Sequence, residues 1–266
     1  MLHPSGQKVI DPNPDGIFPG KQQPLKGLKM KRTFFKDYTK WMAQFLHGIG
    51  YDSSGAEKLT EDLYNAFEVE DQHLGDDCFW FPIKDYFEKV VIPHKIEVFK
   101  AGMEVCKTFG LNEWEQKRMV ERLIVHDFSK FSCEEHIAYS SYNFKDNSKN
   151  SESAKMNFKQ AWNHHKHRND HHPEHWLAVN RDGTTQPLVM SRWCQVEMIA
   201  DWIGAGRTYG STLEAWLPNN IHTFVFHPTT ARTLSVMLNQ LVFTDDTNKV
   251  FKFDGNKVVL KEFQEG

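Results

Sequence analysis

Residues 161–176 read AWNHHKHRNDHHPEHW, which places six histidines within sixteen residues of the chain. Upstream, residues 125–130 read VHDFSK, and downstream, residues 197–202 read EMIADW. Imidazole and carboxylate groups are the side chains that proteins use to bind zinc, iron, manganese and similar ions. The three segments together therefore predict the parts of one metal site, contributed by distant portions of the chain.

The overall composition is that of an ordinary globular protein. The chain has 266 residues, of which 39% are hydrophobic and 25% are charged. Its formal net charge is −3, so it lacks the general positive field that favours nucleic acids. We expect no nucleic-acid polymer as a partner, although local basic residues could bind a small anion, and a homodimer is compatible with the sequence.

The cysteines and the N-terminus indicate a cytoplasmic protein. No C-x-x-C pair occurs, which argues against a disulfide framework or a cysteine zinc site and favours free thiols in a reducing compartment. The N-terminus lacks a basic start followed by an apolar run, and no apolar run approaches the roughly 20 residues of a membrane helix. We therefore expect no membrane association. The cysteines are Cys78, Cys106, Cys133 and Cys194.

Apolar residues recur at helical spacing along most of the chain, which predicts a mostly α fold. We expect an N-terminal extension with two helices (1–82), a metal-binding helical domain (83–241) and a small C-terminal β-hairpin (242–266). Residues 1–32 and 68–80 are predicted as extended or loop segments, and 177–190 as a loop. The predicted helices cover about 33–49, 53–67, 83–109 with a restart at Pro93, 112–126, 132–144, 153–168, 191–204 and 228–241.

Helical phase decides which histidines of the cluster face the core. His165 continues an apolar stripe of the helix predicted over 153–168, so its side chain should turn inward. His172 lies seven residues further and keeps that face only if the helix continues. His164 and His171 are the adjacent alternatives.

Two further residues would be costly to bury without a partner. Asp201 lies among apolar neighbours on a predicted helix, and burying an unpaired carboxylate costs several kcal/mol unless it is paired or coordinated. His94 lies on an otherwise apolar helix. Ordinary roles are also possible, because Asp201 could pair with Arg207 or Arg192, and Asp127 could cap the following turn.

The order of these residues resembles the HD superfamily of metal-dependent phosphohydrolases. The HDFSK segment at 126–130 looks like the His-Asp-hydrophobic-small-Lys signature of that superfamily, and Asp201 is similar to the acid on its last helix. A closer resemblance is to HD-like proteins of uncertain function, which share the patterns seen here as HDFSKF (126–131), HKHRNDHH (165–172) and ADWIGAGR (200–207). The resemblance covers roughly residues 84–241 and implies an HD-like helical bundle.

The resemblance also implies a ligand set and one or two divalent ions, with iron, manganese, zinc and nickel all compatible. HD proteins with two ions usually supply separate histidines between the His-Asp pair and the final Asp, and here those must come from 164–172 or from His136. The implied ligands are His94, His126, Asp127, His164, His165, His172 and Asp201.

Three basic residues in the matching segments are candidates to hold a substrate anion. Lys130 follows His126 by one helical turn, and Arg168 and Arg207 lie in the other two matching segments. We expect Lys130 and Arg168 to bind or polarise the anion, by point charge and by bidentate contact respectively. The alternative is that all three form ion pairs that orient nearby carboxylates.

These features favour a metal-dependent hydrolase of a phosphate ester, possibly a nucleotide. Metal-activated water would attack phosphorus, Asp127 would orient it, and Lys130 or Arg168 would stabilise the developing charge. The first alternative is an HD-type diiron oxygenase that oxidises a small anionic substrate. The second is a non-catalytic metal- or ligand-binding module, which predicts saturated coordination.

Overall fold

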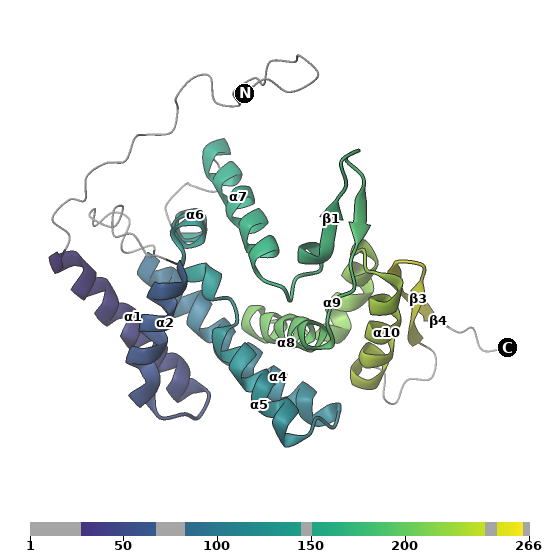
Figure 1. Cartoon of the computed structure of the whole chain (residues 1–266), viewed down its shortest axis with the longest axis horizontal. Helices are drawn as coiled ribbons and strands as arrows, with labels where there is room; N and C mark the ends of the chain where they lie inside the picture. The colour runs from purple at the N-terminus through teal and green to yellow at the C-terminus, as the bar shows by residue number, and fades with distance from the viewer. Residues whose placement is uncertain (1–27, 68–82, 145–150, 243–248, 263–266) are drawn as a thin grey trace, which may run out of the picture.

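The described part of the chain is mostly helical and ends in a small antiparallel hairpin, which confirms the predicted fold class (Figure 1). The predicted loop at 68–80 and most of the predicted segment 1–32 lie outside the described residues. Among the helices that are described, none combines the length and the apolar character needed to cross a membrane. The computed structural model describes residues 28–67, 83–144, 151–242 and 249–262.

The N-terminal region forms two helices that pack against each other, as predicted. Helix α1 covers Leu28–Gly48 and helix α2 covers Ala56–Phe67. A short 3₁₀ turn, Ser53–Gly55, precedes α2, and the Asp52 side chain accepts a 2.8 Å hydrogen bond from the Ser54 amide. An aspartate suits this position because its carboxylate satisfies an amide that has no partner within the helix.

Stacked aromatic rings join the N-terminal helices to the rest of the protein. The Trp41 ring stacks on Phe87 with centroids 4.5 Å apart, and Phe87 stacks on Phe131 at 4.6 Å. All three side chains are buried. Phe131 ends the 3₁₀ turn Phe128–Phe131, which directly follows the His126-Asp127 pair, so the N-terminal core packs against the segment that carries the predicted site.

Pro93 restarts a helix, as predicted, and a wider turn precedes it. Residues 83–86 are α-helical, Phe87–Val91 forms a π-helical turn, and helix α4 covers Ile92–Thr108. Proline has no amide hydrogen to donate and its ring crowds the preceding turn of an α-helix. A π turn changes the hydrogen-bond pattern just before Pro93, which lets the chain remain helical through this point.

The closest helix pair is α4 and α8, which packs more extensively than any other described pair of elements. Helix α8 covers Arg192–Tyr209, longer than predicted, and stops at Gly210 in the left-handed conformation. A Cβ atom on Gly204 would lie 2.6 Å from the Val98 backbone nitrogen, so only glycine permits this approach. The contact brings His94 of α4 and Asp201 of α8 face to face.

Helix α5 covers Glu113–Val125 and packs on α4. It begins at a capping box, in which the Asn112 side chain accepts from the Glu115 amide and the Glu115 side chain accepts from the Asn112 amide, both at 3.0 Å. A Cβ atom on Gly102 of α4 would lie 2.5 Å from a Leu123 methyl group, so α5 also approaches α4 closely. This packing fixes where α5 ends, and therefore where His126 begins.

Helices α6 (Cys133–Phe144) and α7 (Glu152–Arg168) pack against each other. Helix α7 begins at a Ser151 cap, whose hydroxyl accepts from the helix. Ser132 and Glu135, which have the spacing of a capping box, do not form one, because the Ser132 hydroxyl makes no hydrogen bond. The Glu135 side chain turns away from the helix start and binds two histidines of α7 instead.

The predicted loop at 177–190 contains a hairpin of strands β1 (Leu177–Val179) and β2 (Thr185–Pro187). Gly183 in its turn has φ 83°, a conformation that glycine adopts without strain. The strands are three residues long and half exposed, so no alternating apolar pattern marks them. In Figure 1 this hairpin and α7 both stand on the same side of α8.

The C-terminal region adds two helices and the predicted second hairpin. Helix α9 (Leu213–Asn220) was not predicted, whereas α10 (Pro228–Val242) begins at the expected proline. Strands β3 (Lys249–Asp254) and β4 (Lys257–Glu262) pair antiparallel across a tight turn that contains Gly255. Further 3₁₀ turns cover Pro173–Trp176 and Ile221–Thr223.

The hairpin is tied to α10 by both packing and hydrogen bonds. Phe251 and Val258 are buried. The Asn239 side chain of α10 donates to the Phe251 carbonyl at 2.9 Å and accepts from its amide at 2.7 Å. The described cysteines, Cys106, Cys133 and Cys194, are free thiols as predicted, and Cys78 lies outside the described residues.

Candidate metal centre

The centre is built around an unusual turn at the end of α5. Asp127 has φ 57° and ψ 25°, and it is the one non-glycine residue of the described chain with a positive φ. Such a conformation costs on the order of 1–3 kcal/mol and persists where the surrounding structure enforces it, commonly at functional sites. Here the turn directs His126 and Asp127 inward, and each is only 1% exposed.

A buried lysine holds this turn in place. Lys95 is fully buried, and its Nζ donates to the backbone carbonyls of Ile124, at 3.1 Å, and of His126. Burial lowers the pKa of Lys95 to about 7. The neutral amine still carries two N–H donors, which is enough for both carbonyls. Lys95 thus satisfies the otherwise unpaired end of α5 directly below the His-Asp pair, a role that the sequence did not reveal.

The first ligand group consists of His94, His126, Asp127 and Asp201. The Nε2 atom of His94 lies 3.1 Å from Asp201 Oδ1 and 3.3 Å from Asp127 Oδ2. The Nε2 atom of His126 lies 3.3 Å from Asp127 Oδ2 and 3.4 Å from Asp201 Oδ1. Two ligand atoms that share an ion at about 2.1 Å are themselves ~3.0–3.4 Å apart. The group therefore has the spacing of a divalent-ion site.

The second ligand group consists of Asp127, His165, His171 and His172. The Nε2 atoms of His165 and His171 each lie 3.4 Å from Asp127 Oδ1. The His172 ring lies 4.4 Å from the His171 ring and 4.8 Å from the His165 ring, measured between centroids. Asp127 thus presents Oδ2 to the first group and Oδ1 to the second, which is the arrangement of a carboxylate that bridges two ions.

Several atoms of the two groups are buried without any hydrogen bond, as expected of residues that could hold a cation. A buried polar atom that lacks a partner costs about 1–3 kcal/mol, so a concentration of such atoms at one point needs an explanation. Coordination of two ions would satisfy them all. The atoms are His94 Nε2, His126 Nε2, Asp127 Oδ1, His171 Nε2 and His172 Nε2.

Two carboxylates outside these two groups contact the imidazoles, and one of them, Glu197, also forms a third possible ligand group with His126 and His171. Glu197 Oε1 lies 3.0 Å from His126 Nδ1 and 3.3 Å from His171 Nδ1, and Glu135 Oε2 lies 2.8 Å from His165 Nδ1. A proton on Nδ1 that is donated to a carboxylate leaves Nε2 free as a ligand. The sequence analysis did not predict these roles. One available signal was the position of Glu197 one helical turn before Asp201, on the same face of α8.

Arg122 contacts Glu197 and a further carboxylate, Asp170. Its Nε donates to Glu197 Oε2 at 2.8 Å, and its Nη2 contacts Asp170 at 2.5 Å. Burial raises the pKa of the Glu197 carboxyl, but hydrogen bonds from His126 and His171 and their positive charge outweigh burial and hold it below its usual range. Glu197 is therefore ionised, and one carboxylate joins α5, α8 and the segment that follows α7.

The structure does not bring His164 into either ligand group, although the resemblance implied it as a ligand. Successive residues of an α-helix point about 100° apart, so adjacent histidines cannot both face one centre. His165 points into the centre, while His164 Nδ1 lies 2.8 Å from Glu135 Oε1 on a side chain that is 36% exposed. His171, expected only as an alternative, takes a ligand position. His136 also lies elsewhere, with Nδ1 bonded to the Phe131 carbonyl.

The three expected anion-binding residues are placed differently from one another. Lys130 Nζ lies 2.5 Å from Asp127 Oδ2. Burial opposes the charge on Lys130, but the attraction of Asp127 outweighs it and raises the pKa of the ammonium. Arg207 does not reach the centre, because it forms an exposed bidentate pair with Glu104. Six residues after Asp201, it lies on another face of α8.

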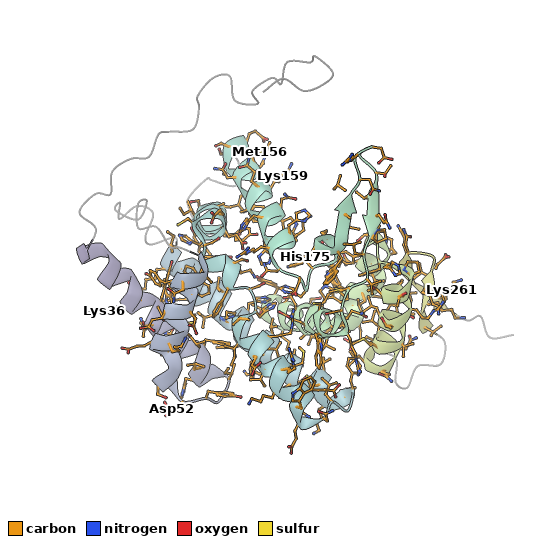
Figure 2. All side chains as sticks on the ribbon, viewed as in Figure 1. Lys36, Asp52, Met156, Lys159, His175 and Lys261 are labelled. Carbon is orange, nitrogen blue, oxygen red and sulfur yellow. The ribbon has the colours of Figure 1, made fainter. Side chains whose placement is uncertain are left out.

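Arg168 lines a hollow of about 270 Å³ that opens beside the ligands. The hollow also exposes Arg122 and Asn169 next to Asp127 and His171. Only the C-terminal end of α7 contributes to this region, since Met156 and Lys159 lie toward its opposite end (Figure 2). The remaining lining residues are Val125, His126, Asp170 and Glu197.

Five imidazoles and two carboxylates, from helices and the segments that follow them, lie together and define a helical protein with a candidate metal centre. Residues 83–240 match DUF5662, which is described as a family of unknown function, and the chain belongs to that family. No curated protein and no solved structure matches the chain.

Proposed function

We propose that this protein is a metal-dependent hydrolase of phosphate esters. The observation that supports the proposal most directly is Asp127, whose two oxygens face two separate histidine-rich ligand groups beside a hollow with two arginines. Two divalent ions, of iron, manganese, zinc or nickel, would lower the pKa of a bound water and neutralise phosphate charge. The resemblance of the ligand order to HD phosphohydrolases agrees with this chemistry.

The protonation states of the surrounding residues suit hydrolysis of an anionic substrate. Burial raises the pKa of the Asp127 carboxyl, but the charges of His126, Lys130 and His165 outweigh it and hold that pKa well below its usual range. Asp127 is therefore ionised and available as a ligand. Lys130, whose pKa is raised, stays protonated near neutral pH. It can stabilise negative charge on the substrate, but it cannot accept a proton from water.

Arg168 and Arg122 would position the phosphate group in the hollow. A guanidinium presents paired N–H donors that match two phosphate oxygens, and such bidentate contacts are stronger than neutral hydrogen bonds. Arg122 already neutralises Glu197 and Asp170, so it contributes mainly to the shape of the hollow. Arg168 is exposed and lines the same hollow, so it is placed to contact the substrate directly.

The test is elemental analysis of protein purified without added metal, followed by phosphate-release assays with phosphomonoesters in manganese, nickel, zinc or magnesium. We expect two equivalents of bound metal and phosphate release that a chelator abolishes. Arg168→Ala should raise KM, and Arg207→Ala serves as a matched control because Arg207 lies away from the centre. Protein that holds two ions but releases no phosphate from any ester would contradict the proposal.

A diiron oxygenase is the second candidate function. Each ligand group supplies at least two imidazoles and one carboxylate, which is a donor set that non-haem iron oxygenases use. Two equivalents of iron, with substrate-dependent oxygen consumption and no phosphate release, would favour this function. A full complement of metal with neither reaction would indicate a non-catalytic binding module.

A further inference from the structure

A second hollow lies next to the one over the metal ligands. It has a volume of about 300 Å³ and shares Val125, Arg168 and Asn169 with the first hollow. Its far wall is formed by Asp62 and Ala66 of α2. Helix α2 ends before residue 83, where the match to the family begins. A helix outside the family match therefore lines a space that adjoins the hollow beside the candidate centre.

The packing of α2 holds this wall at a defined place. Leu63 of α2 is fully buried, and α2 contacts both α1 and the 3₁₀ turn that follows Asp127. Tyr38 of α1 links the two, since its ring lies 5.6 Å from the Tyr64 ring and 5.6 Å from the Phe131 ring. Because α2 and the His-Asp turn belong to one packed core, the outer hollow keeps its position relative to the ligands.

The walls of the outer hollow differ chemically from those of the inner one. Ala66, Val125 and Phe128 supply apolar surface. The Ser129 hydroxyl also lines it, but it already accepts from Asn169 Nδ2 at 2.7 Å. The carboxylate on this wall, Asp62, is paired with Lys58 at the surface, so the pair adds no net charge to the wall. The inner hollow thus suits a phosphate, and the outer hollow suits a compact and largely apolar group.

Resting on the hydrolase function proposed above, we propose that the outer hollow binds the organic part of the substrate. The substrate class is a phosphomonoester whose organic group is compact and mostly apolar. Hydrolysis breaks the ester P–O bond, forms a new P–O bond from water, and transfers a water proton to the departing alcohol. A hollow of about 300 Å³ is at the lower end of the range for ligand sites, roughly 300–1,000 Å³, which disfavours nucleoside polyphosphates.

The test places a large side chain on the wall contributed by α2. Ala66 and Asn65 are both exposed on α2, but only Ala66 lines the hollow, so Asn65→Trp is a matched control for Ala66→Trp. With phenyl phosphate as substrate, we expect Ala66→Trp to raise KM about tenfold or more and Asn65→Trp to change it less than about twofold. Inhibition by orthophosphate, which needs only the inner hollow, and metal content should remain the same in both variants.

Equal KM values for the two tryptophan variants would overturn the proposal. So would faster hydrolysis of adenosine triphosphate than of phenyl phosphate by the unmodified protein.

A binding measurement distinguishes failure of the proposed hydrolase activity from failure of the proposed organic-group site. If no ester is hydrolysed, phenylphosphonate binding to the metal-loaded protein is measured by calorimetry. Binding that weakens about tenfold in Ala66→Trp, but not in Asn65→Trp, would retain the outer hollow as the organic-group site while rejecting hydrolysis. The same affinity in all three proteins would reject the site itself.

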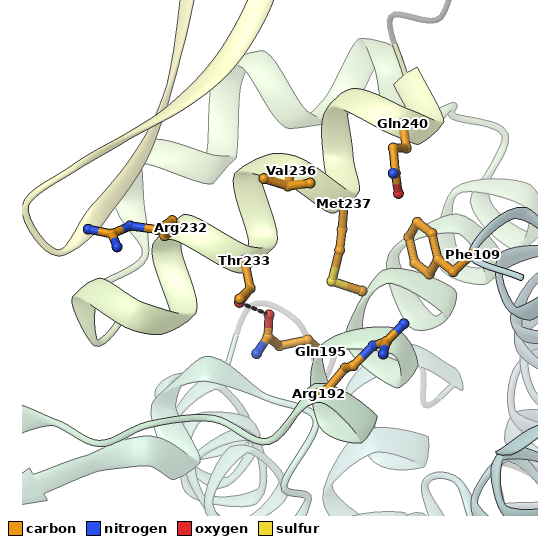
Figure 3. A pocket seen from close by; sticks show the side chains of 8 residues that line it. All are labelled: Phe109, Arg192, Gln195, Arg232, Thr233, Val236, Met237 and Gln240. Carbon is orange, nitrogen blue, oxygen red and sulfur yellow. Dashed lines mark hydrogen bonds between the residues drawn. The ribbon is translucent and has the colours of Figure 1, made fainter. Parts of the chain in front are cut away.

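Figure 3 shows a larger hollow elsewhere, between α8 and α10, with Arg192 and Phe109 on one side and Met237 and Gln240 on the other. Its buried polar group, Gln195, is already engaged, because it accepts from Thr233 at 2.7 Å and donates to the Met190 carbonyl at 2.9 Å. No polar group on its wall is left buried and unsatisfied to specify an occupant, so the outer hollow beside α2 is the better-defined site.

Discussion

The two ligand groups share Asp127, but their other residues lie on structural elements of different kinds. In the first group, His94 and Asp201 project from α4 and α8, whose backbones touch at Gly204. In the second group, His165 lies in the last turn of α7, and His171 and His172 follow the end of that helix. Ligands on packed helices are held more firmly than ligands on connecting segments. The first position should therefore bind its ion more tightly than the second.

The largest effect is expected from the residue that both groups share. Asp127→Asn removes the negative charge and one of the two bridging oxygens, while asparagine still tolerates the left-handed backbone. We expect neither ion to survive dialysis, with helix content unchanged by circular dichroism. Elemental analysis that finds even one full equivalent of metal in the variant would show that Asp127 does not bridge the two groups.

The next largest effect on metal retention should distinguish the two ligand groups. Asp201→Ala should leave no retained metal, because the tighter site is lost and the weaker one cannot hold its ion through dialysis. His172→Ala should retain about one equivalent, because the first group is intact. The order of affinity that we propose would be reversed if His172→Ala lost both ions and Asp201→Ala kept one.

The close contact of α4 and α8 can be disturbed directly. Gly204→Ala places a methyl group against the Val98 backbone, and we expect it to lower the free energy of unfolding by about 1–3 kcal/mol. Metal affinity should fall more at the first position than at the second. Gly55→Ala is the control, because its nearest contact would be 3.8 Å from a Leu46 methyl group. Chemical denaturation measures the free energy of unfolding, and metal titration measures the affinities. If Gly204→Ala and Gly55→Ala gave the same values, the first position would not depend on the close packing of α4 and α8.

Substitution of Glu197 should have a smaller effect on metal affinity, and the effect should be similar for both ligand groups. Glu197→Gln weakens the acceptor for His126 and His171, one imidazole of each group, so we expect each ion to bind about 10–100-fold less tightly. Competition with a chromophoric chelator measures this change. Glu104→Gln, which disturbs only the exposed pair with Arg207, should leave both affinities unchanged. Loss of a single ion in Glu197→Gln would argue against a role of Glu197 in both ligand groups.

Much of the first ligand group could be predicted because its residues are conspicuous in their local surroundings. An aspartate among apolar neighbours at 201 and a histidine on the apolar helix at 94 each indicate a buried partner. Helical phase likewise selected His165. It could not show that both His171 and His172 join the second group, because both follow the end of α7, where the periodicity stops.

The outer parts of the centre were harder to predict because their roles depend on contacts between distant segments. Nothing near Lys95 in the sequence indicates that its amine reaches the carbonyl of His126. The sequence around Glu135 suggests a helix cap, whereas tertiary packing directs it to α7. The position of α2 beside the hollow depends on how α1 and α2 pack against the His-Asp turn, and periodicity shows only which face of a helix is buried.

The central claim is that Asp127 joins two cation sites. Anomalous diffraction from crystals of protein purified without added metal, measured at the absorption edge of the metal found by elemental analysis, tests it most directly. We predict two peaks on either side of the Asp127 carboxylate, about 3.5–4 Å apart. The absence of any peak between α4, α8 and the end of α7, or a single peak remote from Asp127, would contradict the account.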